Sequence, residues 1–307
     1  MKKRFVTSRR KKHKFVKKIF FFLLFVLSLI VSFHFLSKSN IVIDDRSLVE
    51  VLLNPNEVSF KSIVGKKIKN LFSEPVMLLD NNYFKNVSTT TNDNSNVKKV
   101  EKPIIYIYNS HQGEEYAHST FAEFSVQPTV LFADYALENV FNKNNYQTMV
   151  EEASIKEILN INGWRYAYSY MASRILLENA KSSTPSLKYF IDVHRDSLER
   201  ERTTVTIGDK VYAKTIFLIG LENETYEENL AFTEEINSLM NTKYPNLSKG
   251  IYKKGGAGVN GVYNQDFSNR TILIEIGGYE NTPSEVLNSV LAFADCFMEV
   301  ISKYEKG

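Results

Sequence analysis

Cysteine is nearly absent from this chain, which has a single one, Cys296, in 307 residues. One cysteine cannot form an internal disulfide, and it excludes the zinc sites that are built from several cysteine ligands. No histidine lies near Cys296 in the sequence, so we expect a structural thiol rather than a nucleophile. Histidine is scarce too, because only His111, His118 and His194 follow the first 40 residues. Any metal site in this part of the chain therefore has few ligands to draw on.

Acidic residues are missing from residues 1–18, which carry ten Lys or Arg. Residues 19–36 then form an apolar run with three polar interruptions, about long enough to span a membrane as a helix at ~1.5 Å per residue. No small-residue cleavage pattern follows, so we expect an uncleaved anchor, and a cleaved leader is the alternative. The basic tail then stays in the cytoplasm, and everything after about residue 37 lies outside the membrane.

The net charge of +3 hides an acidic exported part, because the first ten cations belong to the predicted anchor. Beyond residue 18, 28 Lys and Arg stand against 35 Asp and Glu, a net charge of about −7. A domain that binds nucleic acid needs a basic face. We therefore expect no nucleic-acid partner.

Composition divides the chain into four parts. Residues 37–101 have a weak apolar pattern and include a stretch made almost only of Asn, Ser, Thr and Asp. Such a stretch buries too little to repay its ordering entropy, so we expect a stalk or linker that is partly disordered. Residues 102–307 suit a single folded domain. They follow the basic tail (1–18), the anchor (19–36) and the stalk.

Strand and helix patterns alternate within residues 102–307. Three near-continuous apolar runs predict strands that are buried on both faces, at 103–111, 187–194 and 271–275. A shorter strand at 146–150 and a hairpin about Gly208 are also expected. Helical spacing predicts crossover helices at 130–141, 164–180, 232–239 and 283–301. The last helix has a capping-box start with Pro at its first position. This alternation predicts an α/β fold with a mostly parallel sheet covered by helices on both faces.

Each of the three apolar runs ends on a residue that can bind or serve a metal, namely His111, His194 and Glu275. Open α/β sheets place their active crevices at the carboxyl ends of such strands. A catalytic zinc ion needs three protein ligands, commonly two His and one carboxylate. His111 and Glu114 form an H-x-x-E pair that can converge on one ion, with His194 as the natural third ligand. Chance occurrence is the alternative for the H-x-x-E pair alone.

His194 is flanked in the sequence by two carboxylates, Asp192 and Asp196. Either one could orient the imidazole ring by accepting its second N–H. The alternative is a hydrogen-bonded histidine at a strand end with no metal.

Glu275 interrupts an apolar strand, where a carboxylate is costly unless it is paired, metal-linked or catalytic. With a raised pKa, such a carboxylate can take a proton from water and pass it to a leaving amine. The alternative is an ion pair with Arg195 or Arg270.

Three segments together resemble one known family. NSHQGEEY (109–116), IDVHRDS (191–197) and LIEIGGYENT (273–282), in this order behind an N-terminal anchor, resemble the stage II sporulation protein P (SpoIIP) family of cell-wall hydrolases. That family is similar to the zinc-dependent N-acetylmuramoyl-L-alanine amidases. The likeness covers about residue 104 to the C-terminus, and it implies an amidase-like fold for the domain.

The resemblance implies that His111, Glu114 and His194 bind Zn²⁺ and that Glu275 is the catalytic acid/base. Glu115 and Glu123 are rivals for the carboxylate ligand, because related amidases take this ligand from farther downstream.

Many family members carry a second His two positions before the first motif's main one, where this chain has Asn109. That departure points to His111 as the essential ligand. It leaves open a substrate-binding role for Asn109.

The implied activity is removal of stem peptides from peptidoglycan, with a second endopeptidase activity on cross-links, during engulfment of the forespore. The implied partners are a SpoIID-like transglycosylase and a SpoIIM-like membrane protein. Arg195, next to a predicted ligand, could stabilise the oxyanion or dock a stem-peptide carboxylate. Two other functions remain open on the residues alone, a zinc carboxypeptidase acting on wall peptides and a non-catalytic scaffold that binds the wall.

Overall fold

The computed structural model describes residues 44–53, 102–121 and 124–306. The predicted basic tail and membrane anchor lie outside the described residues. Within those described ranges, no helix is both long enough and apolar enough to cross a membrane.

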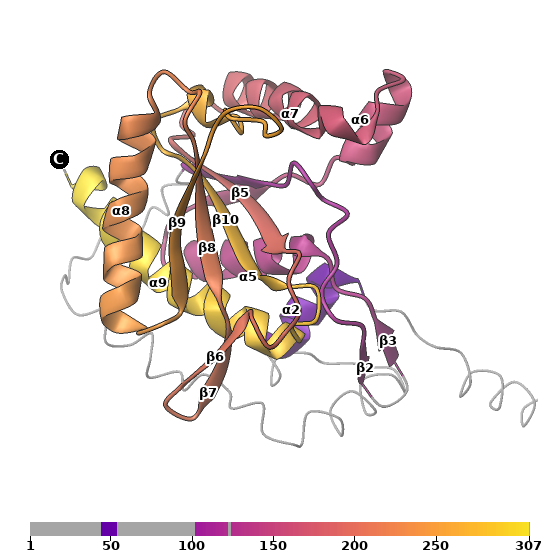
Figure 1. Ribbon diagram of the computed structural model, residues 1–307, viewed down its shortest axis with the longest axis vertical. Helices are drawn as coiled ribbons and strands as arrows, with labels where there is room; N and C mark the ends of the chain where they lie inside the picture. The colour runs from indigo at the N-terminus through magenta and orange to yellow at the C-terminus, as the bar shows by residue number, and fades with distance from the viewer. Residues whose placement is uncertain (1–43, 54–101, 122–123, 307) are drawn as a thin grey trace, which may run out of the picture. The chain divides into compact units, whose positions relative to one another are not determined.

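A six-stranded sheet forms the centre of the fold, in the order β4-β1-β5-β10-β8-β9 (Figure 1). Four of its five neighbouring strand pairs are parallel, and β8 runs antiparallel to β10. The strands are β1 (Ile105–Tyr108), β4 (Thr148–Val150), β5 (Tyr189–Asp196), β8 (Thr215–Gly220), β9 (Ser248–Lys254) and β10 (Thr271–Gly278). The predicted α/β fold with a mostly parallel sheet is confirmed.

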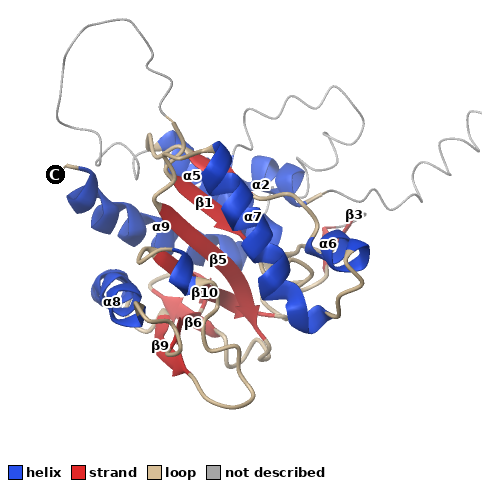
Figure 2. Ribbon diagram, turned by 90° about the horizontal axis from the view of Figure 1, so that it is seen from above, coloured by secondary structure: helices blue, strands red, loops and turns tan. Residues whose placement is uncertain are grey.

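Helices cover both faces of the sheet. They are α5 (Val130–Lys143), α7 (Ser169–Ser183), α8 (Tyr226–Lys243) and α9 (Pro283–Glu305). Tyr189 on β5 packs against Phe232 of α8 and Phe297 of α9, with ring centroids 6.0 and 5.9 Å apart. The next residue, Phe190, points to the opposite face and packs with Leu177 of α7. Figure 2 shows α7 lying across β1 and β5.

The closing helix α9 begins as the sequence predicts. The Thr282 side chain accepts the N–H of Glu285, the Glu285 side chain accepts in return at the cap, and Pro283 stands at the first helical position. Cys296 lies buried on this helix, and burial raises the pKa of its thiol to about 12. The structure therefore agrees with a structural thiol.

One predicted helix is broken in the structure. The single helix expected at 164–180 is a 3₁₀ turn, η1 (Tyr166–Tyr168), followed by α7, and an additional helix α6 (Ile155–Ile161) precedes them. Gly163, at a φ of 63°, lies between α6 and η1.

The predicted hairpin about Gly208 is formed by β6 (Thr204–Ile207) and β7 (Lys210–Ala213). The chain then enters the main sheet as β8. Separately, β2 (Ser119–Phe121) and β3 (Phe124–Val126) form a two-stranded sheet of their own.

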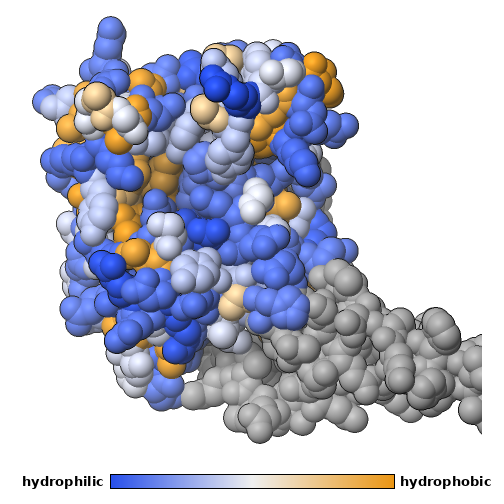
Figure 3. Space-filling view, turned by 45° about the vertical axis from the view of Figure 1, so that its right-hand side comes forward, coloured by the Kyte–Doolittle hydropathy of each residue, from blue (hydrophilic) through white to orange (hydrophobic). Residues whose placement is uncertain are grey.

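The face of the molecule drawn in Figure 3 is largely hydrophilic, with its hydrophobic residues in small separate areas. Large exposed apolar side chains occur on the segment from α6 to α7, and they are Ile161, Tyr166, Tyr168, Met171 and Ile175.

One helix occurs inside the segment predicted to be a stalk. Helix α2 (Asp45–Leu53) packs against α5 and buries Leu48, Val49 and Leu52. Each buried apolar side chain of this size contributes roughly 1.5–3 kcal/mol. Residues 44–53 therefore pack as part of the folded domain, earlier in the chain than the predicted start at residue 102.

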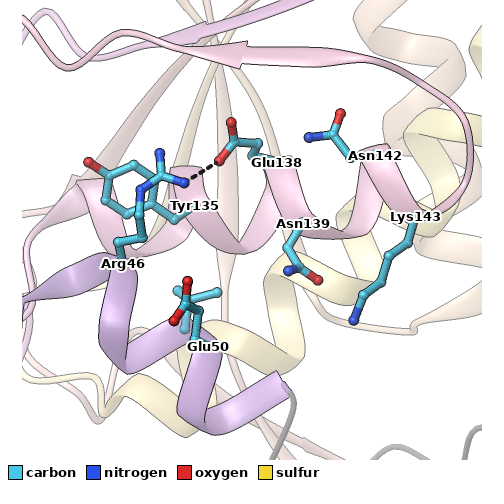
Figure 4. A pocket seen from close by; sticks show the side chains of 8 residues that line it. Arg46, Glu50, Tyr135, Glu138, Asn139, Asn142 and Lys143 are labelled. Carbon is cyan, nitrogen blue, oxygen red and sulfur yellow. Dashed lines mark hydrogen bonds and ion pairs between the residues drawn. The ribbon is translucent and has the colours of Figure 1, made fainter. Parts of the chain in front are cut away.

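Polar contacts fix the N-terminal end of α2 against α5. The Asp45 carboxylate accepts the Thr129 hydroxyl at 2.6 Å and the Thr129 N–H at 3.1 Å, at the start of α5. Figure 4 shows Arg46 lying over Tyr135 and pairing with Glu138, at 3.1 Å, beside a pocket between the two helices. Exposed ion pairs of this kind add about 0–1 kcal/mol, so the apolar contacts and Asp45 carry most of the attachment.

Candidate metal centre

The loop after β1 holds His111 and Glu114 face to face. The Glu114 N–H donates to the His111 carbonyl at 3.0 Å, and the Val130 N–H at the start of α5 donates to the Glu114 carbonyl at 3.0 Å. These bonds leave His111 Nδ1 3.6 Å from Glu114 Oε1. The predicted H-x-x-E pair therefore points both side chains at one place.

His194 reaches the same place from the end of β5. Because β1 and β5 are parallel neighbours, with Tyr108 paired to Asp192, their carboxyl ends meet at one edge of the sheet. His194 Nδ1 lies 3.4 Å from Glu114 Oε2. One ligand atom from each of His111, Glu114 and His194 lies within 4.8 Å of the other two. The structure thus brings all three predicted ligands together.

Hydrogen bonds fix the ring of the nearly buried His194. Its Nε2 lies 3.0 Å from Asp192 Oδ1 and 2.9 Å from Ser110 Oγ. Ser110 in turn donates to both Asp192 oxygens, from its N–H at 2.9 Å and its hydroxyl at 2.8 Å. Of the two carboxylates considered from the sequence, Asp192 orients the ring, and Asp196 pairs instead with Lys249 at 3.0 Å.

The electrostatics of the site favour a bound cation. Burial opposes the charged form of Glu114, but hydrogen bonds from His111 and His194 outweigh it and hold the pKa of Glu114 well below its usual range. Burial also opposes the charged form of His194, but Asp192 and Glu114 outweigh it and raise the pKa of that imidazole. Metal binding at such a site releases the imidazole proton.

The donor set fits zinc. Two imidazoles and one carboxylate, with a fourth position left to water or substrate, make up a common catalytic zinc site. His111 Nδ1 lies 3.6 Å from Glu114 Oε1 and His194 Nδ1 lies 3.4 Å from Glu114 Oε2, separations similar to the roughly 3.3 Å between two ligand atoms that share a zinc ion at about 2.0 Å. The triad of His111, Glu114 and His194 can therefore hold a metal ion.

Glu275 lies beside the triad on the neighbouring strand β10. It pairs in parallel register with His194, so both side chains leave the sheet on the same face. Burial and then the charge of Asp196 raise the pKa of Glu275, His194 opposes the shift, and Glu114 adds to it. These interactions place the Glu275 carboxylate within the electrostatic field of the triad.

The alternative ion pairs for Glu275 do not form among the described residues. Arg270 donates to the Tyr189 hydroxyl at 3.2 Å and lies over the Tyr304 ring. Arg195 donates from Nε to the Glu115 carbonyl at 2.9 Å and from Nη1 to the Asp196 carbonyl at 3.3 Å. Both guanidinium groups are thus engaged elsewhere.

Arg195 braces the loop that carries Glu114. Besides its two side-chain bonds, its backbone N–H donates to Glu114 Oε2 at 2.9 Å. The residue therefore holds both the backbone after Glu114 and the carboxylate itself.

The other candidates from the sequence lie apart from the triad or outside the described residues. Glu115 is exposed and pairs through its backbone with Thr129. Glu123 lies outside the described residues, and His118 is exposed and is not part of the triad. Asn109 is buried and donates to the Val193 carbonyl at 2.8 Å, which ties the ends of β1 and β5 together.

Two contributors to the site were not assigned from the sequence. Ser110 holds Asp192, and Tyr166 stacks on the His111 ring with centroids 5.0 Å apart. The position of Ser110 next to His111 was the available signal for the first. Nothing in the spacing of Tyr166 points to the second.

Comparison with known proteins gives a family match. The family model described as Stage II sporulation protein P (SpoIIP) matches residues 56–298. The stage II sporulation protein P of Bacillus subtilis (strain 168) is 36% identical over 213 residues, which cover 67% of this chain and 53% of that protein. The chain thus spans about half the length of this relative.

Several solved structures show weaker similarity. The CwlD amidase from Clostridioides difficile, solved in complex with the GerS lipoprotein, is 11% identical over 65% of this chain and 99% of that one, with a TM-score of 0.39. Cwp6 from Clostridium difficile is 12% identical over 66% of this chain and 30% of that one, with a TM-score of 0.40. A metallo-carboxypeptidase from Burkholderia cenocepacia is 10% identical over 67% of this chain and 58% of that one, with a TM-score of 0.37. Similarity at this level does not establish a shared activity.

Proposed function

The chain belongs to the stage II sporulation protein P (SpoIIP) family, and we propose that it is a membrane-anchored, zinc-dependent hydrolase of peptidoglycan. The reaction is that of an N-acetylmuramoyl-L-alanine amidase, with endopeptidase activity on cross-links as a second reaction. The observation that carries the proposal is the convergence of His111, Glu114 and His194, with Glu275 beside them on the same face of the sheet.

His111, Glu114 and His194 would hold the zinc ion. When bound, zinc supplies a Lewis acid that polarises the scissile carbonyl and lowers the pKa of the attacking water. Asp192 keeps the His194 ring turned so that Nδ1 faces Glu114, because Nε2 is committed to the Asp192 carboxylate.

Glu275 moves the proton. Its carboxylate takes a proton from the attacking water and passes it to the leaving amine nitrogen, so the amide C–N bond breaks without leaving an amide anion. A raised pKa suits both halves of this transfer, since the group must accept the proton and then give it up near neutral pH.

Arg195 positions the Glu114 carboxylate. Its contacts with Glu114, Glu115 and Asp196 keep the carboxylate ligand in place. Direct contact of its guanidinium with an oxyanion or a substrate carboxylate stays a prediction.

The anchor at residues 19–36 holds the catalytic domain outside the cell membrane, with the N-terminus in the cytoplasm. The proposed setting is engulfment during sporulation, together with a SpoIID-like transglycosylase and a SpoIIM-like membrane protein. Family membership and the predicted anchor support this setting.

The test uses the full-length protein in detergent with purified sacculi. Release of whole stem peptides with free amino termini should require zinc and should fall about 10²–10⁴-fold in Glu275→Gln, which keeps its zinc. Glu280→Gln, an exposed carboxylate just past the same strand, is the matched control and should keep full activity. Unchanged release by Glu275→Gln would remove Glu275 from the proposed mechanism.

The products separate the alternatives. A carboxypeptidase releases single amino acids from the ends of stem peptides, whereas an amidase releases the peptides whole. A scaffold releases neither and carries less than about half an equivalent of zinc.

A further inference from the structure

The two candidate histidine ligands are held in different ways. His194 is fixed by hydrogen bonds to Asp192 and Ser110. Metal-binding histidines usually have such a partner on the ring nitrogen that does not bind the metal. Among the described residues, the His111 ring has one ion-pair partner, Glu114, which is itself a candidate ligand. Its other neighbours are aromatic rings, those of Tyr166, Tyr170 and His194, so ring contacts are left to orient His111.

Aromatic rings surround the His111 imidazole. Tyr166 stacks on it, with centroids 5.0 Å apart and planes 24° apart. Tyr170 meets it edge-on, with centroids 5.4 Å apart and an interplanar angle of 63°. Tyr170 also lies nearly parallel to His194, at 6.5 Å. Tyr166 is thus the ring that covers a flat face of His111.

The backbone around Tyr166 is held by a hydrogen bond and by packing, whereas the Tyr166 side chain is largely exposed. The Ser169 hydroxyl donates to the Tyr166 carbonyl at 2.6 Å, and Trp164 packs against the apolar cluster around Leu159. Tyr166 itself is 61% exposed, far more than a core tyrosine. Its ring therefore contributes little to the core, and its contact with His111 needs another explanation.

The loop of His111 is tied to the same segment. The Gln112 side chain donates to the Ala153 carbonyl at 3.2 Å and accepts the Ile155 N–H at 3.3 Å, where α6 begins. These bonds tie the loop that carries His111 to the start of α6, the helix that precedes Tyr166. Stacking of Tyr166 on the imidazole then limits rotation of that ring about its Cβ–Cγ bond.

Building on the proposed zinc hydrolase, we propose that Tyr166 is a positioning residue for His111, and that its ring replaces the hydrogen-bond partner that His194 has in Asp192. The flat contact keeps His111 Nδ1 turned towards Glu114. The negative face of the tyrosine ring also favours the imidazole once that ring carries positive charge from a bound cation. The hydroxyl is not needed for either effect.

Zinc affinity of the full-length protein, measured by competition with a chelator, tests this inference. Tyr166→Ala should weaken zinc binding roughly three- to tenfold, the range expected for a stacked aromatic contact. Tyr166→Phe should bind as the unaltered protein does, because it keeps the ring. Tyr168→Ala is the matched control, because Tyr168 lies two residues on, is 41% exposed and packs against Trp164. It should leave zinc affinity unchanged.

Activity at saturating zinc adds a second readout. Because the effect acts through metal binding, release of peptides by Tyr166→Ala should recover as zinc is raised. Equal zinc affinity in Tyr166→Ala and the unaltered protein would overturn the inference, and so would an equal loss in Tyr166→Phe or in Tyr168→Ala. Absence of zinc binding by the unaltered protein would instead reject the proposed hydrolase itself, so the two failures are distinguishable.

Discussion

His194 Nε2 lies 3.0 Å from Asp192 Oδ1, while Nδ1 of the same ring lies 3.4 Å from Glu114 Oε2. The carboxylate on one side thus selects the tautomer that offers Nδ1 to a metal on the other. Pairs of this kind usually strengthen the basicity of the metal-binding nitrogen. The candidate centre therefore depends on residues that never touch the ion.

Asp192→Asn should weaken zinc binding about 10–100-fold, because the neutral amide holds the imidazole N–H less strongly. The substitution keeps the shape of a fully buried side chain, and circular dichroism checks that the fold is retained. Chelator competition measures the affinity. Asp196→Asn is the control and should bind zinc normally, because Asp196 pairs with Lys249. Equal affinities in the two variants would argue against the assigned tautomer.

Asp196→Asn should instead change the pH profile of hydrolysis. The charge of Asp196 raises the pKa of Glu275, so its removal lowers that pKa. Glu275 must be ionised to accept a proton, and activity therefore rises as pH increases through its pKa. The acid limb of kcat/KM should move to lower pH in the variant. An acid limb that stays at the same pH, or that moves to higher pH, would contradict Glu275 as the base.

Much of the sheet, and the residues of the candidate metal site, could be predicted from the sequence. Strand β1, which leads to His111, and strands β5 and β10, which contain His194 and Glu275, are near-continuous apolar runs, and such runs need no distant information to be recognised. The start of α9 carries its own local capping signal in Thr282 and Glu285. These features depend on neighbouring residues only.

Other features depend on contacts between distant residues, and the sequence pattern does not contain them. Helix α2 has only nine residues and is stabilised by packing on α5 rather than by its own propensity. The bond from Ser110 to Asp192 requires the register of β1 against β5. The stacking of Tyr166 on His111 requires the path of the chain between α6 and α7.

Asp134→Asn should make the protein more stable at neutral and alkaline pH. Asp134 is fully buried on α5, and burial raises its pKa well above the usual range. In the unfolded chain the Asp134 carboxyl ionises near pH 3.9, whereas in the folded protein it stays protonated to higher pH. The free energy of unfolding therefore falls as pH rises from about 3.9 towards the pKa of Asp134 in the folded protein, by at most about 1.4 kcal/mol per pH unit.

Asparagine does not ionise, so Asp134→Asn does not lose stability in this way. The free energy of unfolding in urea should exceed that of the unaltered protein by a small amount at pH 4 and by a larger amount at pH 8. An advantage that shrinks as pH rises would show that Asp134 is ionised in the folded protein.

Asp45→Ala should destabilise the domain by about 1–2 kcal/mol, since it removes the acceptor for two Thr129 donors at the start of α5. Equilibrium unfolding in urea measures the change. Glu50→Ala, an exposed position on the same helix, is the control and should change stability by less than about 0.5 kcal/mol. If the two variants are equally stable, α2 is not held by Asp45.

The most direct test of the central claim is X-ray absorption at the zinc edge, combined with metal analysis of the full-length protein. The account predicts about one zinc per chain, bound by two imidazoles and by oxygen at about 2.0–2.2 Å. The imidazole signal should fall in both His111→Ala and His194→Ala. A protein that carries no zinc, or a zinc spectrum that is the same in both variants as in the unaltered protein, would contradict the account.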